Sequence, residues 1–205
     1  MKKMLFLSLL IPVIAFSQKS GSLGIGLKFG PNFSDVSNAS SFGGSNRVGF
    51  NAGIFLDIGK KLIGSRTEIL YSQQGFNYSN DSTKGSETHN YIALAQLIVV
   101  NITKYVQVQA GFQTGYLLNV KVDNSQTTGI ASVDNVLKYY NRFDYGFTGG
   151  IEIHPYLGIL VGARYNLSFS NLYNQDYQNL TSGNSSSPTV DFKNNVVQVF
   201  VGYKF

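Results

Sequence analysis

The chain has 205 residues, of which 13% are charged, with a formal net charge of +5 and no cysteine. A typical soluble domain is about 25% charged, so this composition argues against an ordinary soluble protein, and the missing cysteines exclude disulfides and thiolate chemistry. The 22 glycines, 13 tyrosines and 15 phenylalanines are typical of strands joined by tight turns. We therefore expect one all-β domain.

The first 17 residues predict a secretory signal peptide. Lys2 and Lys3 form a basic start, an apolar run follows from 4 to 16, and Ala15 and Ser17 are small residues before a cleavage point. A single membrane anchor is the alternative, but the run is shorter than the roughly 20 residues that a spanning helix needs. Without Lys2 and Lys3 the formal charge falls from +5 to +3, so nucleic acid is not an expected partner.

Eight segments with a period-two pattern follow, and no later run of 18 apolar residues could form a spanning helix. In the second segment, for example, Phe50 and Ile54 lie on one face and Asn51 lies on the other. The fourth segment is apolar on both faces, so the pattern does not assign its orientation. The expected strands span 22–34, 47–58, 61–76, 90–101, 104–119, 142–153, 156–170 and 192–205.

The connections between these segments alternate between short and long. Short turns are expected at Gly59-Lys60, Ile102-Thr103 and His154-Pro155, and long polar loops at 35–46, 77–89, 120–141 and 171–191. A soluble sandwich is the alternative fold, but it has no reason to sort its loops by length. The pattern predicts that residues 18–205 form an eight-stranded antiparallel up-and-down transmembrane β-barrel, with short periplasmic turns and long extracellular loops.

Charged residues within the strands are expected to point into the barrel, because charges facing lipid are costly. The inward set is Asp57, Arg66, Glu68, Asp144, Glu152 and Arg164, with Lys204 near the end of the chain. We interpret this set as a structural network that fills the narrow lumen of an eight-stranded barrel. An ion path past Arg66 and Glu68 is the alternative.

The last segment ends in VVQVFVGYKF and alternates strictly. Its apolar row, with Val201, Tyr203 and Phe205 at the end, is expected to face lipid, and the strand is expected to pair with residues near Gly24-Ile25-Gly26-Leu27. This row also resembles the signal by which the outer-membrane assembly machinery recognises its clients.

Residues with catalytic potential are few. His89 is expected in a long loop and His154 in a short turn, at opposite ends of the barrel, so they cannot share a metal site. A hydrolase using His89 with Asp81 or Glu87 is an alternative to plain solvation of that loop. We expect no catalytic residues, no metal and no cofactor.

Seven stretches of the chain resemble the outer-membrane β-barrel domain family to which the PorT-like proteins belong. They are GLKFGPNFSD at 26–35, GFNAGIFLDI at 49–58, TEILYSQQGF at 67–76, VQVQAGFQTGYLL at 106–118, YGFTGGIEI at 145–153, LGILVGARYNLSFSNL at 157–172 and VVQVFVGYKF at 196–205. The family often has an acidic residue and a proline in its fourth strand, where this chain has Ala93 and Ala95. The resemblance implies an eight-stranded barrel in the outer membrane, and it does not imply the secretion role of PorT itself.

The expected function is a structural or surface-interaction role in the outer membrane of a Gram-negative cell, carried by exposed loops on a rigid scaffold. A narrow transport pore and an accessory role in a PorT-like secretion system are the alternatives. The expected partners are membrane lipid, lipopolysaccharide and the assembly machinery, and the expected state is a monomer. Lipopolysaccharide phosphates would meet basic residues in or beside the loops, namely Arg47, Lys84, Lys121, Lys138, Arg142 and Lys193.

Overall fold

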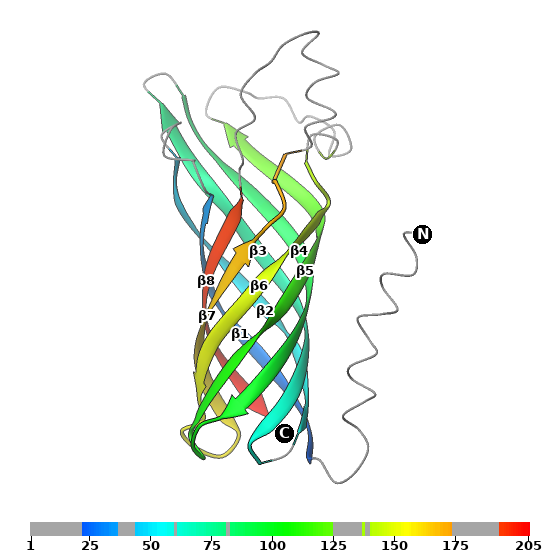
Figure 1. Cartoon of the computed structure of the whole chain (residues 1–205). Helices are drawn as coiled ribbons and strands as arrows, with labels where there is room; N and C mark the ends of the chain where they lie inside the picture. The colour runs from blue at the N-terminus through cyan, green and yellow to red at the C-terminus, as the bar shows by residue number, and fades with distance from the viewer. Residues whose placement is uncertain are drawn as a thin grey trace, which may run out of the picture.

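The computed structural model describes residues 22–36, 44–59, 61–80, 83–124, 137, 140–173 and 193–205. Within these ranges eight strands form a closed barrel in chain order, which confirms the predicted fold class (Figure 1). The strands are β1 (Ser22–Val36), β2 (Gly44–Gly59), β3 (Ile63–Asn80), β4 (Thr83–Asn101), β5 (Val106–Asn124), β6 (Phe143–Ile153), β7 (Ile159–Ser168) and β8 (Asn194–Lys204). The predicted signal peptide, 1–17, lies outside the described residues. Among the described residues, no helix is long and apolar enough to cross a membrane.

The barrel closes where β8 pairs with β1. Their antiparallel register joins Gly26 to Lys204 near one end and Val36 to Asn194 near the other. The backbone N–H of Phe205 also donates to the carbonyl of Ile25 at 2.9 Å. The predicted pairing of the last segment with the first is therefore confirmed, and the seam satisfies backbone groups that lipid could not.

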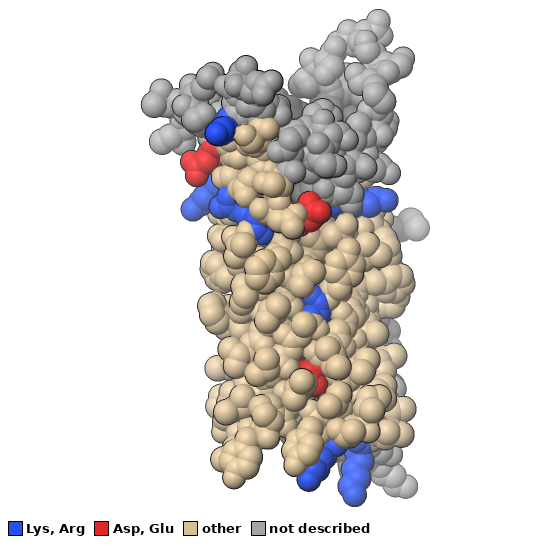
Figure 2. All heavy atoms as spheres, turned by 90° about the vertical axis from the view of Figure 1, so that its left-hand side faces the viewer, with Lys and Arg blue, Asp and Glu red and all other residues tan. Residues whose placement is uncertain are grey.

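The outer surface of the barrel is apolar because side chains alternate along each strand. In β7 every second residue from Leu160 to Ser168 is buried, and the residues between them are exposed. The exposed set includes Val161, Tyr165 and Leu167. Figure 2 shows a wide middle zone that is almost free of charged side chains, which gather at the two ends. Such an exterior suits hydrocarbon, whereas a soluble monomer rarely exposes so large an apolar patch.

The orientation of β4, which the sequence pattern left open, is settled by burial. Ala93 and Leu97 point inward and are at most 2% exposed, whereas Ile92 and Ile98 point outward. Gln96 also lies on the outer side, where its side chain bonds to Thr67 and to Ser65. The strand is apolar on both faces because its inner face forms an apolar wall of the lumen, and one outward amide is satisfied by its neighbours.

One end of the barrel, here called the turn end, carries the short connections at 60–62, 102–105 and 154–158. The third of these was expected at His154-Pro155, but the chain reverses further on, where Ile159 N–H donates to the Tyr156 carbonyl at 2.9 Å. Its two central residues, Leu157 and Gly158, have φ values of 42° and 80°. Positive φ at both positions is typical of a type I′ turn, and glycine adopts it without strain.

At the opposite end, here called the loop end, the strands extend further than the sequence predicts. The long loop expected at 77–89 is wrong, because β3 continues to Asn80 and pairs throughout with β4 from Thr83 onward. Strand β5 likewise continues to Asn124, within the loop expected at 120–141. These extensions lack a clear apolar alternation because they project beyond the lipid-facing zone, as the tall hairpin in Figure 1 shows. The loops expected at 35–46 and 171–191 lie partly outside the described residues.

Candidate functional site in the barrel lumen

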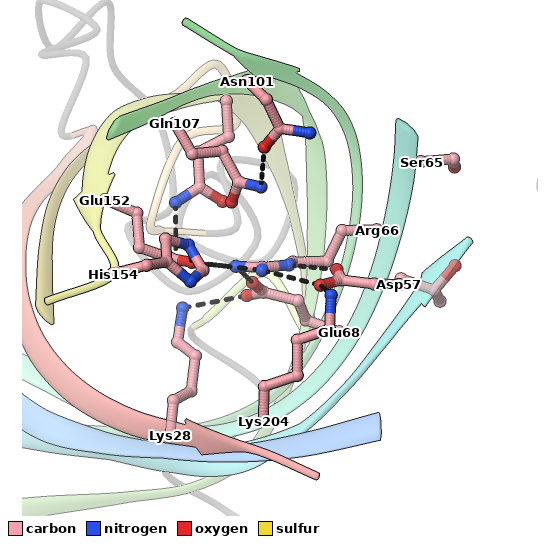
Figure 3. Close-up of polar contacts among 12 residues, drawn as sticks. Lys28, Asp57, Ser65, Arg66, Glu68, Asn101, Gln107, Glu152, His154 and Lys204 are labelled. Carbon is pink, nitrogen blue, oxygen red and sulfur yellow. Dashed lines mark hydrogen bonds and ion pairs between the residues drawn. The ribbon is translucent and has the colours of Figure 1, made fainter. Parts of the chain in front are cut away.

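A network of buried charges fills the part of the lumen nearer the turn end, and Arg66 of β3 is one of its two centres. Its Nη2 lies 3.0 Å from Oδ2 of Asp57 in β2, and its Nη1 lies 2.6 Å from Oε2 of Glu152 in β6. Arg66 and Glu152 have no exposed surface. Figure 3 shows these side chains converging from different strands. One guanidinium therefore joins strands that are not neighbours in the barrel wall.

The second centre is the carboxylate of Glu68, also from β3. It accepts two hydrogen bonds from Arg164 of β7, at 2.6 and 2.8 Å, and one from Lys28 of β1 at 2.9 Å. The Nη1 atom of Arg66 lies 3.9 Å from Oε1 of Glu68. Gln109 of β5 connects the two centres, because it accepts from Arg164 at 2.7 Å and donates to Glu152 at 3.3 Å. Glu68 thus has three cationic partners and no contact with solvent.

The network reaches the turn end through two partly exposed residues. Lys204 of β8 donates to Oδ2 of Asp57 at 2.9 Å, and Nε2 of His154 lies 2.9 Å from Oε1 of Glu152. The side chains of Lys204 and His154 are 32% and 25% exposed. The network is therefore dry at its centre and in contact with solvent only at its edge.

Aromatic rings pack against the cations of the network. The Lys28 ammonium lies 4.0 Å from the centroid of Phe200, and the Arg66 guanidinium lies 4.3 Å from that of Phe55. Phe55, Phe200 and Leu160 form one buried cluster. These rings favour the cations through their negative faces and leave little room for water.

Five of the six residues that the sequence predicted as a lumen network lie in this one. They are Asp57, Arg66, Glu68, Glu152 and Arg164. Asp144 does not join them, since its carboxylate lies nearer the loop end and accepts bonds from Ser168 and Ser170. Lys28 and Gln109 belong to the network but were not in the set predicted from the sequence. Lys28 stands between outward Leu27 and Phe29, so the alternation itself could have identified it.

The network supports a structural role more than a chemical one. Among the described residues it contains four cations, Lys28, Arg66, Arg164 and Lys204, and three carboxylates, Asp57, Glu68 and Glu152. Each carboxylate is already engaged by two or more cationic or amide donors, so none is poised to accept a substrate proton. Such buried pairs contribute little net stability and instead favour one register, since any slip leaves a charge unpaired.

Between the network and the loop end, polar residues face the apolar wall of β4 across the lumen, and Asp144 is a charged residue among them. The residues around a small cavity there include Gln74, Gln113, Asn166, Ser168 and Asn194. The cavity measures about 10 Å³, which is close to the space that one water molecule needs. It is therefore too small for a solute larger than water.

At the loop end the lumen is covered by a cap, which we define as Leu137, Tyr140, Leu172 and Tyr173 packed on the barrel residues Phe76, Tyr91, Leu117 and Val120. His89 lies beneath this cap with no exposed surface, so its expected position in a solvated loop is wrong. Its ring centroid is 5.4 Å from that of Tyr140, and its Nε2 is 3.2 Å from Oε2 of Glu87. The position depends on segments far along the chain, and no local pattern reveals it.

Glu87 ties the cap to β4. Its Oε2 accepts a hydrogen bond from the Tyr140 hydroxyl at 2.8 Å and a longer one from the Tyr173 hydroxyl at 3.5 Å. Burial raises the pKa of the Tyr140 hydroxyl well above its usual range, and the neighbouring Glu87 charge raises it further. Both phenols therefore act as hydrogen-bond donors to one carboxylate.

Replacing Tyr140 with Phe is expected to loosen the cap, because a hydrogen bond to a charged group contributes about 1.5–3 kcal/mol. Limited proteolysis of the folded barrel in detergent should cut the Tyr140→Phe variant faster near the cap. Tyr173→Phe is the matched control, with a smaller expected effect because its bond to Glu87 is longer. Equal cleavage of wild type and Tyr140→Phe would contradict the importance of this bond.

The raised pKa has a testable consequence at high pH. The Tyr140 hydroxyl contributes its full stabilisation below the ordinary tyrosine pKa of about 10, and the contribution falls as the pH rises above that value. Tyr140 itself should not ionise near pH 10. An absorbance titration of the folded protein should therefore show the same tyrosine amplitude near pH 10 for wild type and for Tyr140→Phe.

Histidine and acidic residues do not gather into a metal site in the described ranges, where no group of three or more His, Cys, Asp or Glu could hold an ion. His89 and His154 lie at opposite ends of the barrel.

The predicted lipid-facing row of β8 lies on the outer surface of the barrel. The exposed fractions of Val201, Tyr203 and Phe205 are 51%, 46% and 73%.

Comparisons with known proteins agree with this architecture. A family model described as outer membrane protein beta-barrel domain matches residues 16–174. Neisserial surface protein A has a similar structure, at 14% identity and a TM-score of 0.55, over 91% of this chain and 100% of that one. Ail, the attachment invasion locus protein of Yersinia pestis, is similar at 13% identity and a TM-score of 0.46, over the same shares. A sequence search of curated proteins finds no match.

The likeness to the Neisserial protein supports the fold alone, because the identity is low. The family match extends over more than half of the chain and supports an outer-membrane location, without specifying a PorT-like subtype. Strand β1 begins and strand β8 ends at the turn end, which carries the short connections. In outer-membrane barrels the short turns lie on the periplasmic side, so the turn end is assigned to the periplasm and the loop end to the cell exterior. The chain belongs to the outer membrane protein beta-barrel domain family.

Proposed function

We propose that this protein is a monomeric outer-membrane barrel with a closed lumen, and that it acts through interactions at the cell surface. The observation that carries the proposal is the filled interior. The centres of the charge network, Arg66 and Glu68, lie in the lumen without exposed surface, and the cap covers the loop end. A solute would have to break several buried ion pairs to pass, so transport is disfavoured.

The loop end offers the surface for such interactions. Strands β3, β4 and β5 extend together beyond the barrel, with Tyr78 opposite Gly85 and Gly85 opposite Asn124. Pairing of β5 with β6 stops at Tyr116 and Phe143, so β5 has no β6 partner beyond that point among the described residues. A rigid, projecting sheet can present side chains to a partner with little ordering cost.

Basic residues around the loop end suit the phosphates of lipopolysaccharide. Exposed ones include Lys84, Lys121 and Arg142, and Figure 2 shows basic side chains gathered near that end. Arg47 and Lys193 are partly exposed, and Lys138 lies outside the described residues. Charge-assisted hydrogen bonds to phosphate would hold the barrel in the outer leaflet. This role adds to the surface interaction and does not replace it.

The closed lumen is tested by recording single channels in planar bilayers. The purified, folded protein should show no steady, reproducible conductance, because no aqueous path crosses the charge network. A known open porin reconstituted in the same lipid is the positive control. A stable unitary conductance, seen in events that become more frequent as protein concentration rises, would refute the closed lumen and favour a narrow pore.

The proposal also holds that the protein is not an enzyme. His89, the residue with the most catalytic potential, is fully buried under the cap beside Glu87 and Tyr140. Replacing His89 with Phe should change no hydrolytic rate measured on lipid or peptide substrates. A rate that is present in wild type and lost in His89→Phe would overturn this part of the proposal.

A further inference from the structure

Two turns at the periplasmic end are joined into one unit. The β2–β3 connection contains Lys61 and Leu62, and the β4–β5 connection runs from Ile102 to Tyr105. Asn101 bonds to both residues of the first turn: its N–H donates to the Leu62 carbonyl at 2.8 Å, and its side-chain amide donates to the Lys61 carbonyl at 3.0 Å. The two turns therefore lie side by side with a fixed spacing.

The second turn is rigid in its own right. The hydroxyl of Thr103 accepts from the N–H groups of Tyr105 and Val106, at 3.1 and 3.0 Å. Ile102 N–H donates to the Val106 carbonyl at 2.9 Å. Lys104 projects from this turn with its ammonium 4.6 Å from the Tyr105 ring. A pre-ordered turn presents its lysine with little loss of entropy on binding.

Apolar side chains on the same turns face outward. Leu62 and Ile102 are both 61% exposed, and Ile63 and Tyr105 are about half exposed. Water is a poor environment for four such residues in one patch, whereas the zone between headgroups and acyl chains accommodates them, particularly the tyrosine. We therefore expect this patch to lie in the periplasmic leaflet of the membrane, near the depth of the phosphate groups.

The charged side chains at this patch are positive. Lys61 and Lys104 are both exposed. The acidic side chains described near the turn end, Asp57 and Glu152, are turned into the lumen and held there by Arg66. At the lower rim in Figure 2 the charged side chains in view are basic. Among the described residues, these two carboxylates are therefore engaged in the lumen and do not compete with an anion for the two lysines.

We propose that the paired turns form a binding site for an anionic phospholipid of the periplasmic leaflet. Lys61 and Lys104 take its phosphate, and Leu62, Ile63 and Ile102 line the path of its acyl chain. The site differs from the loop-end contacts proposed above in membrane leaflet, in lipid and in residues. Its failure would therefore leave the surface role untouched.

The test uses the full barrel in lipid nanodiscs that contain a photoreactive phospholipid. The probe carries the reactive group on its acyl chain and either a phosphatidylglycerol or a phosphatidylcholine headgroup, and labelled peptides are identified by mass spectrometry. Labelling at 61–63 and 102–105 should favour phosphatidylglycerol. The preference should be at most about fivefold for each lysine, or roughly 30-fold for the pair.

Three variants make the test specific. Lys61→Gln/Lys104→Gln should abolish the headgroup preference at the turns, and Lys61→Arg/Lys104→Arg should retain it. Lys84→Gln/Lys121→Gln removes the same charge from the loop end and should leave labelling at the turns unchanged. Heat-modified migration on gels confirms that each variant is folded. Equal labelling by both probes, or a preference that survives the Gln substitutions, would overturn the proposal.

Discussion

Replacing Glu68 with Gln is expected to lower the free energy of unfolding of the barrel by about 3–5 kcal/mol, the usual cost of removing one partner from a buried ion pair. The loss is large because Glu68 is the partner of three cations at once, Lys28, Arg164 and Arg66. Gln keeps the shape of the side chain but cannot offset the charge of the buried lysine and arginines. Since the chain has no tryptophan, urea unfolding in detergent micelles is followed by far-UV circular dichroism.

The matched control is Lys28→Met. Lys28 bonds to Glu68 alone within the network, and Met fills similar space against the Phe200 ring. After this change Glu68 still has both arginines, so the expected loss is about 1 kcal/mol or less. The double variant Lys28→Met/Glu68→Gln should recover part of the loss caused by Glu68→Gln. Equal losses for the two single variants would contradict the central position of Glu68.

Replacing Phe205 with Ala is expected to reduce insertion of the protein into the outer membrane of cells severalfold. The prediction rests on the outward row Val201, Tyr203 and Phe205, which we expect the assembly machinery to bind. Phe205 is 73% exposed, and the centroid of its ring lies 5.2 Å from that of the Tyr203 ring. The seam bond from its backbone N–H to Ile25 survives the substitution. Membrane fractionation with heated and unheated gel samples measures the folded fraction.

The stability of the purified barrel separates recognition from folding. Because the Phe205 side chain faces lipid or detergent and makes few contacts within the protein, Phe205→Ala should lower the free energy of unfolding no more than Ile102→Ala does. Ile102→Ala removes a comparably exposed apolar side chain from the same end and should insert normally. Normal insertion of Phe205→Ala would count against the recognition role.

Much of the barrel wall could be predicted because lipid imposes a strict period of two. That period places Arg66, Glu68 and Arg164 on the inner face before any contact is known, and they do meet there. The period-two pattern fails as a guide where the strand no longer faces lipid on one side and a polar lumen on the other. The 77–89 segment projects beyond the lipid, so its strands carry no apolar face. In β4 the inner face is itself apolar, so Ala93 and Ile92 cannot be distinguished by polarity.

The residues of the cap and the exact membership of the network depend on long-range packing. His89 is buried only because Tyr140 and its neighbours, far along the chain, fold over it. Asp144 has the same inward pattern as Glu152, yet it lies at a different height and bonds to serines. The pattern gives the face on which a side chain lies, whereas its partner depends on strand stagger, which period two does not determine.

Asp57 and Arg66 pair within one hairpin, 9 residues apart, but other ion pairs of the lumen join segments that are far apart in the sequence. Glu68 and Arg164 are separated by 96 residues, and Asp57 and Lys204 by 147. No partial sheet can satisfy these charges, since a half-built wall would turn them toward acyl chains. We therefore expect insertion to be all-or-none: the charges penalise every incomplete intermediate in the membrane, and only ring closure removes the penalty.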